Sequence, residues 1–153
     1  MKVLLTAACM HAVSSVYGVP EPDLWALMAQ ERGRVGEVVQ NKNATYDIGP
    51  FQINSSWVPT FTRLWRLPDN EATLSALRDN GCWNAAAAGV IYQHSLTEAK
   101  GDRHAALGFY HSHTPHLAES YVAQLDGKYQ KLFGLPAFQA SAGNPQDVQR
   151  GAK

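Results

Sequence analysis

The hydrophobic residues of this chain recur mostly at the spacing of α-helices. The clearest case follows Asp23, a residue that can cap a helix. The apolar stripe of this helix occupies positions i, i+3, i+4 and i+7, which are Leu24, Leu27, Met28 and Glu31. The pattern therefore places one carboxylate on the apolar face of a helix.

Later segments show the same periodicity, with capping residues or a first-turn proline near their starts. Residues 33–54 instead combine glycine and asparagine turn formers with no helical period, so we expect an irregular segment or a small β-excursion around residues 36–50. The content of strand formers is too thin for a sandwich, and the sequence predicts an all-α or α-rich single domain. The later predicted helices cover residues 57–65, 70–78, 82–99, 101–110 and 115–133. On the last of them, one apolar face is expected to consist of Leu117, Tyr121, Leu125 and Leu132.

Length and charge exclude some classes of protein. The chain has 153 residues, which suits one domain, and it carries 13 basic and 13 acidic residues. A net charge of zero without a long basic run argues against nucleic acid or an anionic membrane surface as the main partner. Residues 137–153 are mostly small and polar, and we expect them to form a disordered tail.

The N-terminal residues 1–18 have the features of a secretory signal peptide. Lys2 precedes a mostly apolar stretch that is too short to span a bilayer, and Val16 and Gly18 meet the small-residue requirement before a cleavage site. We therefore expect an exported protein whose folded domain covers residues 19–136. The alternative is that the first residues form a core helix.

This leader would also decide the fate of the two cysteines. Its removal takes away Cys9 and leaves Cys82 as the only cysteine, so no internal disulfide is expected. The loss of Lys2 leaves 12 basic and 13 acidic residues, a net charge of −1.

Glu31 is the first candidate for chemistry. A carboxylate on an apolar helix face loses hydration, which favours its protonated form and suits a general acid. The alternative is an exposed residue in the last turn of the helix, paired with Arg32 or Arg34.

The segment YDIGPFQIN, residues 46–54, is the second candidate. Gln52 and Asn54 stand at alternate positions, so an extended segment would direct both amides to one side. Amides both donate and accept hydrogen bonds, as binding of a sugar or peptide requires. The alternative is a turn at Asp47 and Gly49 that leads into a helix and binds no ligand.

Histidines and tyrosines give weaker signals. His111, His113 and His116 have the composition of a metal site, but we expect no acidic residue nearby to orient an imidazole. A solvated turn is the favoured interpretation, and neither a metal nor another cofactor is expected. Tyr110 and Tyr121 lie on predicted helices, where aromatic residues usually belong to the core.

Four motifs follow one another along residues 22–132. They are Glu31-x-Gly33, the block NKNATYDIGPFQIN of residues 41–54, FYHS of residues 109–112, and Tyr121. In this order and spacing they resemble the soluble lytic transglycosylase family, and most closely its small members that accompany conjugation and type IV secretion systems.

The resemblance implies a lysozyme-like fold with a cleft for the glycan strands of peptidoglycan. Glu31 matches the single glutamate that protonates the glycosidic oxygen between N-acetylmuramic acid and N-acetylglucosamine, then removes the muramoyl 6-hydroxyl proton to close a 1,6-anhydro ring. Gln52 and Asn54 match the block that lines the cleft, and Tyr110 and Tyr121 match tyrosines near the acid. The implied partners are peptidoglycan and components of a secretion or conjugation apparatus, and the implied location is the periplasm.

The chain departs from the family pattern at Arg32, where serine is usual, and at His111, where the cleft amide is replaced by imidazole. Glycosidases normally need two carboxylates. Asp47 is the nearest second one, and we interpret it as a turn residue, so one carboxylate suits a lyase better than a hydrolase. A lysozyme-type hydrolase, a catalytically weak glycan-binding assembly factor of the same fold, and a zinc hydrolase built on the three histidines remain as alternatives.

Overall fold

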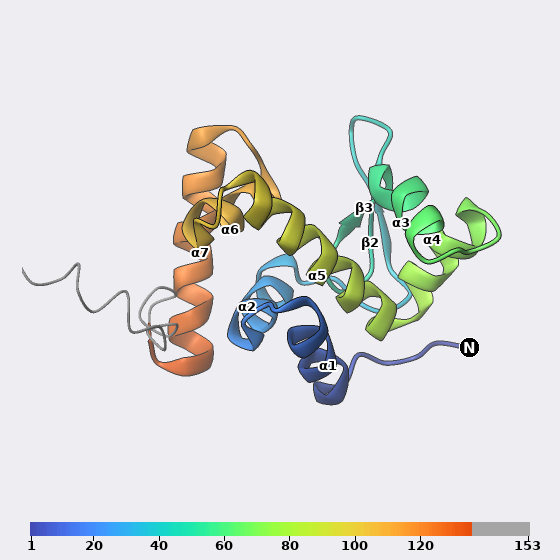
Figure 1. Ribbon diagram of the computed structural model, residues 1–153, viewed down its shortest axis with the longest axis horizontal. Coiled ribbons are helices and arrows are strands. Elements are labelled where there is room, and N and C mark those ends of the chain that lie inside the picture. The colour runs from blue at the N-terminus through green and yellow to red at the C-terminus, as the bar shows by residue number, and fades with distance from the viewer. Residues whose placement is uncertain (136–153) are drawn as a thin grey trace, which may run out of the picture. The chain divides into compact units, whose positions relative to one another are not determined.

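The computed structural model describes residues 1–135, and over this range the chain is α-rich, as the sequence predicts (Figure 1). It forms two compact units, unit 1 over residues 1–93 and unit 2 from residue 94 onward. The predicted tail, residues 137–153, lies outside the described residues. No helix within residues 1–135 is long and apolar enough to cross a membrane.

The helices begin and end close to the predicted bounds because capping residues mark them. Asp69 and Asp102 accept hydrogen bonds from the backbone N–H groups of Ala72 and Ala105, and thereby start the fourth and sixth helices. The α-helices are α1 (Ala7–Tyr17), α2 (Glu21–Glu31), α3 (Val58–Leu64), α4 (Asn70–Asp79), α5 (Gly81–Glu98), α6 (Arg103–His111) and α7 (Pro115–Phe133). A short 3-10 helix, η1 (Ser55–Trp57), precedes α3.

The start of α2 differs from the prediction. The helix begins at Glu21, directly after Pro20, and Asp23 is a fully buried residue of its first turn rather than its cap. The carboxylate of Asp23 accepts a hydrogen bond of 2.8 Å from the hydroxyl of Tyr92 on α5. Asp23 therefore connects two helices of unit 1, a role that the local sequence does not reveal.

The expected β-excursion is a three-stranded antiparallel sheet in the order β1 (Val38–Gln40), β2 (Tyr46–Ile48) and β3 (Ile53–Asn54). Its inner face carries Ile48 and Ile53, which pair across strands and are at most 1% exposed. The third strand lies just beyond the predicted range. The two ends of the segment YDIGPFQIN thus form β2 and β3 of one small sheet.

The N-terminal helix α1 belongs to unit 1 and packs against α2. Met10 and Val13 of α1 are buried, and Val3 forms a bridge to Asn80 just before α5. These contacts agree with the alternative of a first core helix. Removal of residues 1–18 stays a prediction.

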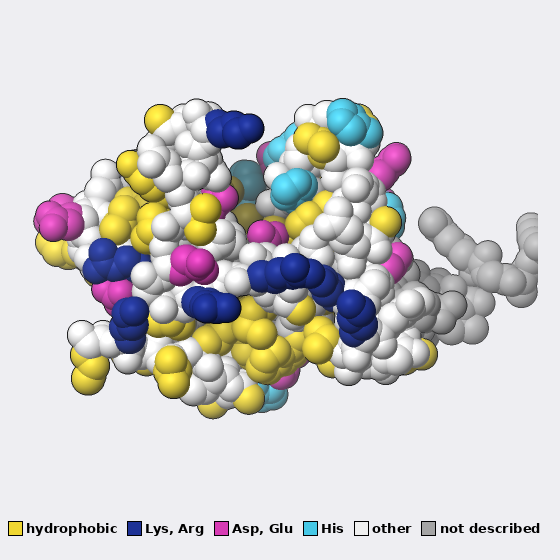
Figure 2. Space-filling model, turned by 180° about the vertical axis from the view of Figure 1, so that it is seen from behind, with side chains coloured by type: hydrophobic (Ala, Val, Ile, Leu, Met, Phe, Trp, Pro, Cys, Tyr) yellow, Lys and Arg dark blue, Asp and Glu magenta, His cyan; other side chains and the backbone are white. Residues whose placement is uncertain are grey.

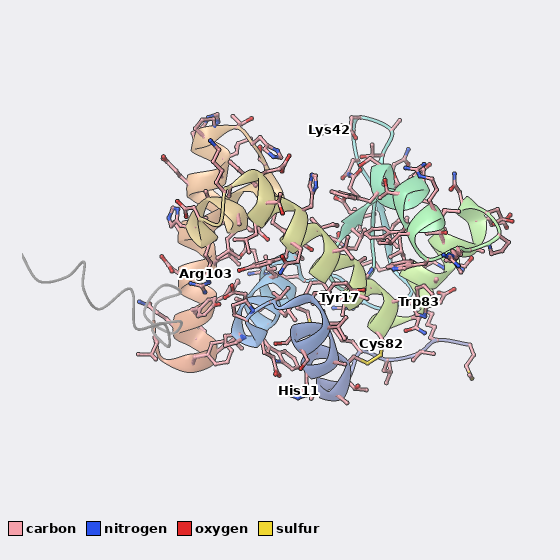
Figure 3. The ribbon with its side chains drawn as sticks, viewed as in Figure 1. His11, Tyr17, Lys42, Cys82, Trp83 and Arg103 are labelled. Atoms are coloured by element: carbon pink, nitrogen blue, oxygen red, sulfur yellow. A yellow bond between two sulfur atoms is a disulfide. The ribbon has the colours of Figure 1, made fainter. Side chains whose placement is uncertain are left out.

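A disulfide joins Cys9 on α1 to Cys82 on α5 (Figure 3). The expectation that no disulfide forms concerns a chain that has lost residues 1–18, and for that chain it stays a prediction. That expectation assumed the loss of Cys9, whereas here both cysteines lie in elements of the same unit.

Unit 2 is built on the packing of α6 against α7. Gly108 permits close approach, because a Cβ atom there would lie 2.9 Å from the Cβ of Ala118. The apolar face predicted for the last helix is correct for Tyr121 and Leu125, which are buried. It is wrong at its two ends, where Leu117 and Leu132 are 43% and 48% exposed.

Candidate active site

Glu31 is the last residue of α2 and is partly buried. The helix ends at Arg32, which adopts a left-handed conformation with φ of 59° and donates its backbone N–H to the carbonyl of Met28 at 3.0 Å. Glycine is the usual residue in this conformation. Arg32 therefore forms a regular helix end, and Glu31, in the last turn of α2, is partly buried.

Gly33 brings this helix end against the segment YDIGPFQIN. A Cβ atom at position 33 would lie 2.5 Å from the Nε2 atom of Gln52 and still closer to the carbonyl oxygen of Gly49. Only glycine allows such an approach, because any side chain would force the two segments apart. The first two sequence motifs, Glu31-x-Gly33 and the GPFQIN block, thus lie side by side in unit 1.

A buried asparagine fixes the turn on the other side. Asn84 is fully buried in α5 and donates from Nδ2 to the carbonyls of Ile48 and Leu77 at 2.8 Å and 2.9 Å. Its Oδ1 atom accepts the backbone N–H of Phe51 at 2.9 Å. Gly49 has φ of 71° and fits beneath this amide, because a Cβ there would lie 2.8 Å from the Asn84 Cγ atom.

Gln52 and Asn54 do not share an extended face, and that part of the prediction is wrong. Gln52 is left-handed, with φ of 49°, and its amide donates to the carbonyl of Gly49 at 3.0 Å. Asn54 lies on β3, where its amide donates to Thr45 Oγ1 and Asp47 Oδ1, each at 3.0 Å. Gln52 lies next to the helix end that carries Glu31, whereas the amide group of Asn54 connects parts of the sheet.

Asp47 is also not the turn residue that we predicted. It lies on β2, paired with Val39 of β1 and Asn54 of β3. Its carboxylate accepts the Asn54 amide. Strand pairing therefore positions the Asp47 carboxylate, and its hydrogen bond with Asn54 connects two strands of the sheet.

Tyr110 and Tyr121 belong to unit 2. Tyr121 is 4% exposed on α7, and its ring stacks on the ring of His111 with centroids 4.7 Å apart and planes 3° from parallel. Tyr110 is partly buried on α6. Tyr121 thus belongs to the core of this unit, as helix-spaced aromatic residues usually do.

The histidines do not gather into a metal site. Within residues 1–135 no group of three or more histidine, cysteine or acidic side chains could hold a metal ion. His113 stacks on Phe109 and contacts Glu98 Oε2 through its Nε2 atom at 2.9 Å. The prediction that these histidines lack an acidic neighbour is therefore wrong, because Glu98 reaches His113 from α5, 15 residues earlier in the chain.

Sequence reasoning missed Asn84, on which the turn depends. The available signal was one amide at the start of the Ala-rich run NAAAAGVIY. A polar residue on a helix that is otherwise apolar needs buried partners, and here those partners are backbone groups of the candidate site.

Figure 2 shows Lys and Arg side chains interspersed with Asp and Glu on the face that it presents, which agrees with the equal numbers of basic and acidic residues.

No protein-family model matches the chain, and no curated protein matches its sequence.

Proposed function

We propose that this protein is a peptidoglycan lytic transglycosylase. It would cleave the β-1,4 bond between N-acetylmuramic acid and N-acetylglucosamine and close a 1,6-anhydro ring. The observation that carries the proposal is the contact of Gly33 with Gly49 and Gln52, which places the end of α2, with its partly buried Glu31, beside the GPFQIN turn. In sequence these are the two motifs that most resemble the soluble lytic transglycosylase family.

The chemistry assigns one residue two successive tasks. Glu31 donates a proton to the glycosidic oxygen as the bond to the muramoyl C1 atom breaks, and the resulting carboxylate then accepts the proton of the muramoyl 6-hydroxyl as its oxygen bonds to C1. Water is not consumed, and Glu31 ends in the protonated form in which it began. Gln52 supplies an amide beside this helix end, suited to hydrogen bonding with sugar hydroxyl or acetamido groups.

The proposed setting follows from the same resemblance. The enzyme would act in the periplasm and open the cell wall locally for a conjugation or type IV secretion apparatus. If residues 1–18 are removed on export, Cys9 is lost with them, so the disulfide between Cys9 and Cys82 belongs only to the chain that retains α1.

The test compares wild type with Glu31→Gln on purified sacculi. Glutamine keeps the size of the side chain but cannot exchange a proton, so release of soluble fragments should fall by at least about 100-fold. Glu71→Gln is the matched control, because Glu71 is an exposed glutamate on α4. Circular dichroism should show that both variants are folded.

Mass spectrometry of the fragments decides the reaction type. Fragments with 1,6-anhydro ends are expected. Reducing ends alone would replace the lyase by a lysozyme-type hydrolase, and binding to sacculi without any release would indicate a glycan-binding assembly factor. Full activity of Glu31→Gln would remove this residue from the chemistry.

A further inference from the structure

Two arginines flank Gly33 at the proposed site. The side chains of Arg32 and Arg34 are exposed, and neither takes part in an ion pair within residues 1–135. The nearest acid in sequence after them, Glu37, places its carboxylate on the backbone N–H of Arg34 at 2.9 Å, so it supports the loop backbone. Two guanidinium groups are therefore available to a ligand beside the end of α2.

The backbone between the two arginines packs against the GPFQIN turn. Because Gly33 makes this contact, the Cα atoms of Arg32 and Arg34 are held next to the turn. Arg32 carries a side chain at a left-handed helix end, where a Cβ atom is disfavoured and glycine is usual. Arg32 and Arg34 thus present two cationic side chains on either side of the Gly33 contact, next to Glu31.

Guanidinium groups suit anionic ligands. Their planar array of N–H donors matches a carboxylate or a phosphate in charge and geometry. A peptidoglycan strand carries peptides with free carboxylates, whereas a polymer of N-acetylglucosamine is neutral. The sugar hydroxyl groups carry no negative charge in either polymer, so only the peptides offer an anion to the arginines.

We propose that Arg32 and Arg34 bind carboxylates of the peptides attached to the glycan strand, so that the protein selects peptide-bearing, anionic glycan. This inference rests on the proposed function, because it specifies which strands the same site accepts. The selected strands would be those that still carry their peptides.

The experiment uses two forms of sacculi, one with its peptide carboxylates intact and one with them converted to neutral amides. Wild type should release fragments from the amidated form about three- to tenfold more slowly, the size expected for two exposed ion pairs. The variant Arg32→Gly with Arg34→Ala should cleave both forms at one rate, close to that of wild type on amidated sacculi. The preference of wild type should shrink as salt is raised.

Arg66→Gly is the matched control. Arg66 is also an exposed arginine in a left-handed conformation, with φ of 53°, but it follows α3 and lies outside the GPFQIN turn. Relief of the backbone conformation is thus common to both glycine variants, whereas loss of substrate preference should occur only at position 32. A loss of preference in Arg66→Gly would overturn the assignment to Arg32 and Arg34.

Two further results would also overturn the inference. One is equal cleavage of both forms by wild type, and the other is an equal loss of rate on both forms in the Arg32→Gly, Arg34→Ala variant.

If wild type cleaves neither form, the proposed function fails, and co-sedimentation of Glu31→Gln with the two forms still tests the inference. Stronger sedimentation with the carboxylated form, abolished when Arg32→Gly and Arg34→Ala are added, would support it, and equal sedimentation would reject it.

Discussion

Asn84 and Phe51 are joined by a hydrogen bond of 2.9 Å from the backbone N–H of Phe51 to the Oδ1 atom of Asn84. The same side chain donates to the carbonyls of Ile48 and Leu77. One buried amide thus satisfies two backbone groups of the turn that precedes Gln52 and one carbonyl group of α4. The position of Gln52 beside the end of α2 depends on a residue that need not touch substrate.

Replacement of Asn84 by alanine should destabilise unit 1 strongly. It leaves three buried backbone groups without their partner, each at a cost of about 1 kcal/mol or more, so the free energy of unfolding should fall by about 3 kcal/mol. Urea unfolding followed by circular dichroism measures this change. Asn80→Ala is the control, because Asn80 accepts backbone N–H groups at the partly exposed start of α5 and its loss should cost about 1 kcal/mol. Equal costs for the two variants would contradict the role of Asn84.

Tyr92→Phe tests the connection between α2 and α5. The substitution removes only the hydroxyl that donates to the buried carboxylate of Asp23, and a hydrogen bond to a carboxylate contributes about 1.5 to 3 kcal/mol. Thermal unfolding should show a lower Tm. Tyr46→Phe should leave Tm nearly unchanged, since Tyr46 is 40% exposed on the sheet. An unchanged Tm in Tyr92→Phe would show that this hydrogen bond adds nothing to stability.

Reduction of the disulfide should destabilise the protein that retains α1. Cys9 and Cys82 are 73 residues apart in the sequence. A crosslink that closes a loop of this size lowers the conformational entropy of the unfolded chain and so raises the free energy of unfolding by about 4 kcal/mol. Urea unfolding with and without reductant measures the loss. The double variant Cys9→Ser, Cys82→Ser should match the reduced protein and ignore reductant. The intact mass of the exported protein, determined in parallel, shows whether residues 1–18 remain.

The carboxylate of Glu98 should make the stability of unit 2 depend on pH. Its pKa lies below the ordinary value of 4.5, first because His113 hydrogen-bonds to it, and further because of the charges of His94 and His113, while partial desolvation opposes the shift. A lowered pKa in the folded state means that the stabilisation is complete above about pH 4.5 and is lost as the pH falls through the folded-state pKa.

Glu98→Gln should therefore lower Tm at neutral pH and flatten its fall on acidification below about pH 4.5. Melting curves at a series of pH values measure both effects. Glu119→Gln, at an exposed position on α7, should follow the wild-type pH profile. A Glu98→Gln profile parallel to wild type over the whole acid range would contradict the contribution of this carboxylate.

The local signals in the sequence were enough for helices α3 to α7 and indicated where the small sheet lies. Caps such as Asp69 and first-turn prolines such as Pro115 act within a few residues of the chain, so they can be recognised without the fold. The stripe that ends at Glu31 likewise depends only on helical spacing, and Glu31 is partly buried as this predicts. Errors arise where partners come from distant segments.

Three such errors concern Asp23, Gln52 and His113. The sequence near Asp23 indicates a cap, but its partner Tyr92 is 69 residues away. Gln52 alternates with Asn54 as in a strand, but packing of Gly49 beneath Asn84 imposes a turn with positive φ. Glu98 and His113 are separated in the sequence by α6, and the fold brings their side chains into contact. Long-range packing decides each case, and spacing along the chain does not encode it.

The contact between Gly33 and Gly49 has one more consequence. It involves the backbone of both glycines, so the register of the candidate acid against the GPFQIN turn depends on these glycines and on Asn84 rather than on the exposed side chains beside Glu31. Residues beside Glu31 can then change during evolution without displacing the acid, provided both glycines stay. The residues beside Glu31 are therefore suitable positions for engineered libraries that aim to change substrate specificity, because substitutions there should disturb the fold little.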